Sequence, residues 1–135
     1  MKQINKKVTG IGGIFFKCDN PEKIKEWYSK NLGLVTNEYG SLFEFGQSGE
    51  SAKKGYLQWS PFPKNTNYFE PSGKYFMINY RVENLDGLVE ELKENGVKIL
   101  DTIEEYEYGK FIHMLDPENN KIELWEPTDT TLDKM

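Results

Sequence analysis

The sequence has few of the residues that disulfides and metal sites depend on. Among 135 residues there is one cysteine, Cys18, and one histidine, His113. A single cysteine excludes an intrachain disulfide and is typical of a reducing compartment, so we expect a cytoplasmic protein. With one histidine, a metal site would have to use carboxylates and amides rather than several imidazoles.

Basic stripes and long apolar runs are also absent. Lys and Arg number 17 against 22 Asp and Glu, which gives a net charge of −5. An acidic chain without a clustered basic face is not expected to bind nucleic acid. No apolar run approaches the length of a membrane span, and the basic N-terminal segment lacks the apolar core of a signal peptide. The 37% hydrophobic and 14% aromatic content predicts one globular domain.

Two stretches of the chain resemble each other. Residues 14–26 (IFFKCDNPEKIKE) align with residues 78–90 (INYRVENLDGLVE). In each copy an apolar strand leads to an asparagine that can cap a helix, Asn20 or Asn84, and a glycine that can end it, Gly33 or Gly96. Apolar residues at helical spacing lie between them: Ile24, Trp27, Tyr28 and Leu32, then Leu85, Leu88, Val89 and Leu92. A period this long indicates a duplicated half-domain rather than a solenoid.

Strand-like segments follow each predicted helix. They lie near residues 34–38, 41–46 and 54–60, and again near 97–103, 109–115 and 121–126. Turn residues without any period fill the stretch between the copies. We therefore predict an α+β domain of two tandem βαβββ modules. The first spans about 8–62, a linker covers 63–73, the second spans about 74–127, and a tail covers 128–135.

The chain resembles the vicinal oxygen chelate superfamily, which includes glyoxalase I, extradiol dioxygenases, fosfomycin-resistance enzymes and bleomycin-resistance proteins. The resemblance covers about residues 8 to 127. It rests on the duplicated module, on WYSKNLG in the first helix, on NYRVENLD before the second, and on DPENNKIELWEP at the end. It implies a glyoxalase-like cup formed by the sheets of both modules.

In metal-dependent members of the superfamily, four side chains hold one divalent ion in the cup. By the resemblance Glu123 is at one ligand position, and the other three positions are Gly13, Leu57 and Met77. Glycine and leucine have no donor atom, and a thioether is a poor ligand for such ions. We therefore expect no cofactor and disfavour a divalent metal, with Glu123 the only matching ligand position.

Strand alternation predicts which side chains share the cup face with Glu123. The predicted ligand-binding residues are Phe15, Lys17, Trp59, Met77, Asn79, Arg81 and Trp125. A match between GYLQWSP and KIELWEP pairs Trp59 with Trp125, and it places Gln58 on the helix face. The two tryptophans either clamp a flat ligand or pack in the core. Lys17 and Arg81 either receive an anionic group at the rim or are solvated.

Two residues are candidates for catalysis. Glu123 lies in an apolar strand, so its carboxylate needs a partner or a proton. It either contacts a ligand and transfers protons, or it forms a structural salt bridge with Arg81 or Lys17. His113 is either a packed side chain or, if it faces the cup, the proton-transfer partner of Glu123.

Two functions are consistent with these features. The first is metal-independent binding of a small, partly aromatic or anionic molecule by a homodimer, similar in architecture to bleomycin-resistance proteins. The second is a glyoxalase-like lyase or isomerase with Glu123 as base and a weak or atypical metal. The apolar, donor-poor cup favours the first. An extradiol dioxygenase is disfavoured, because its iron site needs two histidines and a carboxylate.

Overall fold

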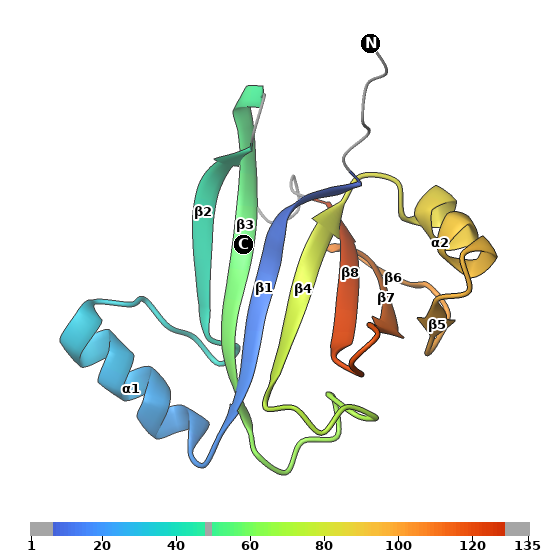
Figure 1. Cartoon of the computed structure of the whole chain (residues 1–135). Helices are drawn as coiled ribbons and strands as arrows, with labels where there is room; N and C mark the ends of the chain where they lie inside the picture. The colour runs from blue at the N-terminus through green and yellow to red at the C-terminus, as the bar shows by residue number, and fades with distance from the viewer. Residues whose placement is uncertain (1–6, 48–49, 129–135) are drawn as a thin grey trace.

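The computed structural model describes residues 7–47 and 50–128. The strands are β1 (Val8–Cys18), β2 (Ser41–Gln47), β3 (Glu50–Pro63), β4 (Phe76–Val82), β5 (Lys98–Ile99), β6 (Glu104–Tyr106), β7 (Gly109–Leu115) and β8 (Lys121–Pro127). The helices are α1 (Pro21–Leu32) and α2 (Leu85–Glu94). The strands form one sheet in the order β2-β3-β1-β4-β8-β7-β5, with β6 paired to β7 (Figure 1).

The two copies of the repeat meet edge to edge through β1 and β4. These strands pair antiparallel, with Ile14 opposite Ile78 and Phe15 opposite Met77. Residues that the sequence alignment equates are therefore neighbours about a local twofold axis. β3 runs parallel to β1 on one side, and β8 runs parallel to β4 on the other. The predicted α+β fold is confirmed.

Both helices begin and end close to where the sequence predicts. The side chain of Asn20 accepts a hydrogen bond from the backbone N–H of Lys23, and that of Asn84 accepts one from Gly87. These are the bonds of an N-cap. Gly33 has φ 75° and Gly96 has φ 78°, a left-handed conformation that glycine adopts without steric cost. The caps therefore fix the lengths of both helices.

The core of the second module lies beneath α2. Leu85 and Val89 of this helix are buried against Ile112, Met114 and Leu124 of the sheet. Because Leu124 and Ile122 alternate with Glu123 along β8, the helices cover one face of the sheet and Glu123 projects from the other. We call this other side the cup face.

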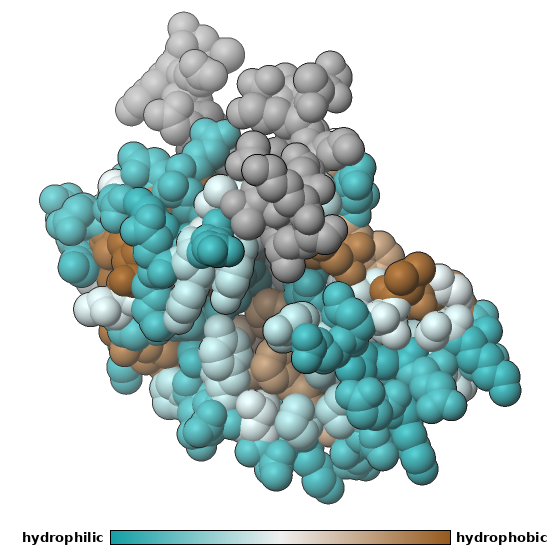
Figure 2. Space-filling view, turned by 180° about the vertical axis from the view of Figure 1, so that it is seen from behind, coloured by the Kyte–Doolittle hydropathy of each residue, from teal (hydrophilic) through white to brown (hydrophobic). Residues whose placement is uncertain are grey.

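The side of α1 that the sequence predicts to be buried is more exposed than expected. Trp27 and Leu32, expected on the buried side of the helix, are 55% and 61% exposed. The buried residue of α1 is instead Lys25, whose ammonium donates hydrogen bonds to the carbonyls of Asn37 and Glu38. Apolar residues likewise reach the surface in patches among mostly hydrophilic ones in the space-filling view (Figure 2).

Several predicted segments differ from the structure. Residues 34–38 form no strand, only an isolated bridge between Asn37 and Gly40. The segment predicted at 97–103 shortens to β5, and β6 is an addition. β3 continues to Pro63, so residues 64–75 connect the modules. Of the predicted tail only residue 128 is described. Within the described parts of the chain, neither helix is long and apolar enough to cross a membrane.

Candidate functional site

Glu123 and His113 lie side by side on the cup face. β7 and β8 pair antiparallel with His113 directly opposite Glu123, and β4 places Asn79 on the other side of Glu123. Directly paired residues project from the same face of a sheet. The strand register therefore decides what the sequence left open, because it brings His113 to the carboxylate of Glu123.

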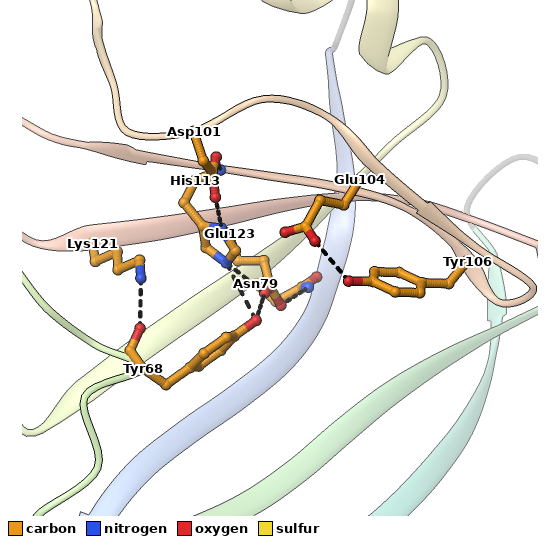
Figure 3. Close-up of polar contacts among 8 residues, drawn as sticks. All are labelled: Tyr68, Asn79, Asp101, Glu104, Tyr106, His113, Lys121 and Glu123. Carbon is orange, nitrogen blue, oxygen red and sulfur yellow. Dashed lines mark hydrogen bonds and ion pairs between the residues drawn. The ribbon is translucent and has the colours of Figure 1, made fainter.

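A chain of hydrogen bonds runs from Asp101 through His113 to Glu123 (Figure 3). His113 Nδ1 is 2.7 Å from Asp101 Oδ2, and His113 Nε2 is 2.7 Å from Glu123 Oε2. The backbone N–H of His113 also donates to Asp101 Oδ1 at 2.8 Å. Asp101 thus fixes His113 through two contacts, one to the imidazole ring and one to the backbone N–H of His113.

Two more side chains complete the surroundings of Glu123. Asn79 Nδ2 donates to Glu123 Oε1 at 2.6 Å, and the hydroxyl of Tyr68 donates to Oε2. Glu123 and Asn79 are each 2% exposed. A buried carboxylate is stable as an anion only where such donors compensate for lost water. Glu123 therefore has the partners that its apolar strand requires.

Burial and charge act in opposite directions on His113. Burial lowers the pKa of the imidazole, but the hydrogen bonds and negative charges of Glu123 and Asp101 outweigh burial and raise the pKa. The two carboxylates thus favour the protonated imidazole, which can donate one N–H to each of them. The pKa of Tyr68 is also raised. Burial is the largest cause, followed by the charge of Glu123 and the hydrogen bond to Glu123. Its phenol is therefore a neutral donor.

Sequence reasoning missed Tyr68 and Asp101. Tyr68 belongs to the connection 64–75, which has no periodicity, so no pattern indicates where its side chain points. Asp101 follows β5, and its place is set when the backbone N–H of Leu100 donates to the carbonyl of His113. An aromatic pair within a turn-rich linker, Tyr68 and Phe69, was the one available signal.

The predicted ligand-binding residues divide into groups. Phe15 and Met77 are buried together with Phe69 in one apolar cluster of the cup. Lys17 is at the cluster's edge, with its ammonium 5.4 Å from the centre of the Phe69 ring. Asn79 contacts Glu123 directly, as described above. The sequence could predict the face on which these four side chains lie without any knowledge of the linker, because the face follows from alternation along β1 and β4.

Arg81 is buried, so its predicted place at the rim is wrong. It is 2% exposed, and its Nη1 donates to the carbonyl of Tyr56 at 3.0 Å. The guanidinium lies 5.3 Å from the centre of the Trp125 ring, a cation–π distance. Trp125 also stacks on Phe111 with planes 7° apart. Arg81 and Trp125 thus fill the cup beside Glu123, and the ion pair of Glu123 is with His113.

Trp59 lies on the helix face, so the prediction that it lines the cup is wrong. Ile14 pairs with Trp59, whereas its repeat equivalent Ile78 pairs with Ile122. Trp59 therefore corresponds to Ile122 and not to Trp125. The similarity of GYLQWSP to KIELWEP aligned the strands in the wrong register, and a shift by an odd number of residues reverses the face.

Packing agrees with this register. The ring of Trp59 meets that of Tyr28 in α1 at 4.9 Å between centroids. Gln58, expected on the helix face, pairs with Gly13 and so belongs to the cup face. Leu57 is correspondingly on the helix face, away from Glu123.

The residues present do not fit the divalent ion of the metal-dependent superfamily members. Within residues 7–47 and 50–128, no three His, Cys, Asp or Glu side chains gather so that they could hold a metal. Met77 is enclosed by apolar residues, and both oxygens of Glu123 already accept hydrogen bonds. The groups available for chemistry are a carboxylate, an imidazole and a phenol.

Comparison with known proteins gives the family. A sequence model of the Glyoxalase/Bleomycin resistance protein/Dioxygenase superfamily matches residues 10–124. No curated protein matches the sequence.

Solved structures share the fold at low identity. Methylmalonyl-CoA epimerase from Mycobacterium tuberculosis has a TM-score of 0.60 and 18% identity over 98% of this chain and 97% of its own. A Streptomyces coelicolor methylmalonyl-CoA epimerase in complex with 2-nitronate-propionyl-CoA has a TM-score of 0.65 and 13% identity over 90% and 99%. A superfamily member from Vibrio splendidus 12B01 has a TM-score of 0.55 and 11% identity over 86% and 97%. The chain belongs to the Glyoxalase/Bleomycin resistance protein/Dioxygenase superfamily.

Proposed function

We propose that the chain is a proton-transfer enzyme, a lyase or isomerase that acts on a small carbonyl or hydroxy compound with Glu123 as its base. The observation that carries this proposal is the hydrogen-bonded chain from Asp101 through His113 to Glu123. A general base needs a carboxylate or imidazole in a fixed position, and a route by which its proton can leave. The three side chains supply both.

The proposed step uses only these groups. Glu123 Oε2 removes a proton from the carbon next to the substrate carbonyl. The C–H bond breaks, an O–H bond forms on Glu123, and the electron pair moves to the carbonyl oxygen to give an enolate. The proton then returns to carbon, or it passes to Nε2 of His113 when this nitrogen carries no proton, and the imidazolium so formed releases its Nδ1 proton to Asp101 and water. The Asp101 side chain is 35% exposed, so the chain of groups reaches water.

The charged chain favours catalysis over simple binding. A cup that only sequesters a ligand can use apolar walls and a few neutral polar groups. Burying the Glu123 carboxylate beside the His113 imidazole carries a desolvation cost that is rarely recovered in stability. Some similar structures are named methylmalonyl-CoA epimerases, which fits an enzyme on this fold. At 18% identity or less they support the fold and not the substrate.

Exchange of substrate hydrogen with deuterium tests the proposal. The protein would be incubated in D2O with 2-hydroxy aldehydes, 2-oxo acids and thioesters, and loss of the proton next to the carbonyl would be followed by NMR. We expect Glu123→Gln to slow the exchange by about 100-fold or more. Glu118→Gln, the same substitution on an exposed turn, is the matched control and should leave the rate unchanged.

Stoichiometric binding of a compound without any exchange of its protons would contradict the proposal. Such a result would favour the binding function. Exchange that is equally fast in Glu123→Gln would show that another group is the base.

A further inference from the structure

The ring of Tyr68 lies in the cup as a bound small molecule would. It stacks on Phe62 with planes 3° apart and centroids 5.8 Å apart, and its other neighbour, His113, meets it edge to face at 5.5 Å. The ammonium of Lys121 lies 5.1 Å from the ring centre. The hydroxyl donates to Glu123 Oε2 and lies 3.3 Å from His113 Nε2 (Figure 3).

Tyr68 stands between Glu123 and solvent. Tyr68 is 38% exposed, whereas Glu123 and His113 behind it are 2% and 5% exposed. A compound that reaches Oε2 of Glu123 must therefore take the place of the Tyr68 hydroxyl. The neighbouring Phe69 is fully buried against Phe15 and Met77, so the linker stays attached when the Tyr68 ring moves aside.

One buried polar atom of the site, Asn79 Oδ1, forms no hydrogen bond with Tyr68. Asn79 Oδ1 is buried and has no hydrogen-bond partner among the described residues, while Nδ2 of the same amide is bonded to Glu123. Buried polar atoms of this kind are rare and call for an explanation. An acceptor beside Glu123 that Tyr68 does not satisfy is what a site for a larger ligand would contain.

We propose that the cup binds a hydroxyaromatic compound whose ring and hydroxyl take the places of the ring and hydroxyl of Tyr68. This inference goes beyond the proposed function. With its hydroxyl on Oε2 of Glu123 the compound occupies the base itself, so it is a ligand that competes with the substrate and is not the substrate. Phe62 provides the flat wall, Lys121 faces the ring, and Glu123 accepts the hydroxyl proton in a hydrogen bond.

The negative charge of Glu123 determines which kind of polar group a ligand can place against Oε2. A ligand carboxylate at this position would put two negative charges in contact, which destabilises both. A neutral O–H donor satisfies Oε2 as Tyr68 does. The group that the ligand presents to Glu123 is therefore a neutral phenol hydroxyl and not an anionic group.

Competition with Tyr68 provides the experiment. Binding of p-cresol and of toluene, which has the same ring without the hydroxyl, would be measured by NMR on the natural protein, Tyr68→Phe and Tyr68→Ala. His113 is the only histidine in the sequence, so its imidazole signals report directly on the site. Retained amide spectra and thermal transitions would show that the variants are folded.

Three results are expected. The natural protein binds p-cresol saturably, with a shift of the His113 signals. Tyr68→Phe, which loses the competing hydroxyl, binds p-cresol more tightly than the natural protein, and Tyr68→Ala binds it most tightly. In Tyr68→Ala p-cresol binds about 10-fold or more tighter than toluene, because toluene leaves Oε2 without a donor.

Equal affinity for p-cresol and toluene would overturn the proposal. So would binding to Tyr68→Ala with none to the natural protein, since the phenol position would then belong permanently to Tyr68. Failure here with intact Glu123-dependent deuterium exchange would refute the ligand class alone. Binding of p-cresol without exchange of any compound would refute the proposed reaction alone.

Discussion

Replacing Gly12 by alanine tests how closely the floor of the cup is packed around Glu123. A Cβ atom at Gly12 would lie 2.3 Å from Asn79 Oδ1, 2.8 Å from Trp125 Cε3 and 2.9 Å from Arg81 Cγ. Carbon atoms do not approach other heavy atoms below 3.0 Å without a shift. Three buried side chains would therefore have to move, and one of them is the hydrogen-bond donor to Glu123.

The expected loss of stability follows from these contacts. Asn79 cannot simply rotate away, because its Nδ2 is bonded to Glu123 at 2.6 Å. Overpacking of a well-packed core costs about 1–3 kcal/mol. Exchanging glycine for alanine in a strand returns roughly 0.5–1 kcal/mol by reducing the entropy of the unfolded chain. We therefore expect Gly12→Ala to lower the free energy of unfolding by about 1–2 kcal/mol.

Gly10 provides a matched control on the same strand. A Cβ atom there would meet Arg81 Cδ at 3.8 Å, an ordinary contact. Gly10→Ala should therefore be as stable as the natural protein or slightly more stable. Urea unfolding gives the comparison, with equal m-values required for it to be valid. If Gly12→Ala were as stable as Gly10→Ala, the close approach of β1 to Asn79 would be refuted.

Three further predictions concern pH, metal and assembly. Because the pKa of His113 is raised in the folded protein, the stability it contributes is full below the ordinary pKa of about 6.5 and is lost as pH rises through the raised value. The free energy of unfolding should thus fall as pH rises above about 6.5, and fall less in Asp101→Asn; an equal fall would contradict this. After exposure to nickel, zinc, manganese and iron and then desalting, elemental analysis should find essentially no metal, whereas one ion per chain would show an unrecognised ligand set. Light scattering should find a homodimer that Trp27→Lys weakens, because Trp27 and Leu32 expose apolar surface on α1; a monomeric natural protein would contradict this.

The fold could be predicted because local signals agree with it. Asn20 and Asn84 cap their helices as their sequence positions indicate, and the aligned strands β1 and β4 meet at the centre of the sheet. Local chemistry and the repeat both point to the same arrangement. Such agreement between levels is what makes a sequence specify a fold.

The site was harder to predict because it depends on strand register and on the linker. Trp59 and Trp125 share a sequence context, yet β3 and β8 have different registers and the two rings lie on opposite faces. His113 meets Glu123 only because β7 and β8 pair as they do. Tyr68 lies in a segment without periodicity, so only tertiary structure shows that it reaches the carboxylate. Register and loop placement are long-range properties that residue patterns do not encode.

Glu123 and Asp101 hold His113 in one hydrogen-bonded chain and raise the pKa of its imidazole. The most direct test is a titration of the imidazole signals by NMR, which is free of overlap because the sequence has one histidine. We predict that the pKa of His113 lies above the ordinary histidine value in the natural protein and falls in Glu123→Gln. A pKa of His113 that is ordinary or lowered, and that does not respond to Glu123→Gln, would contradict the account.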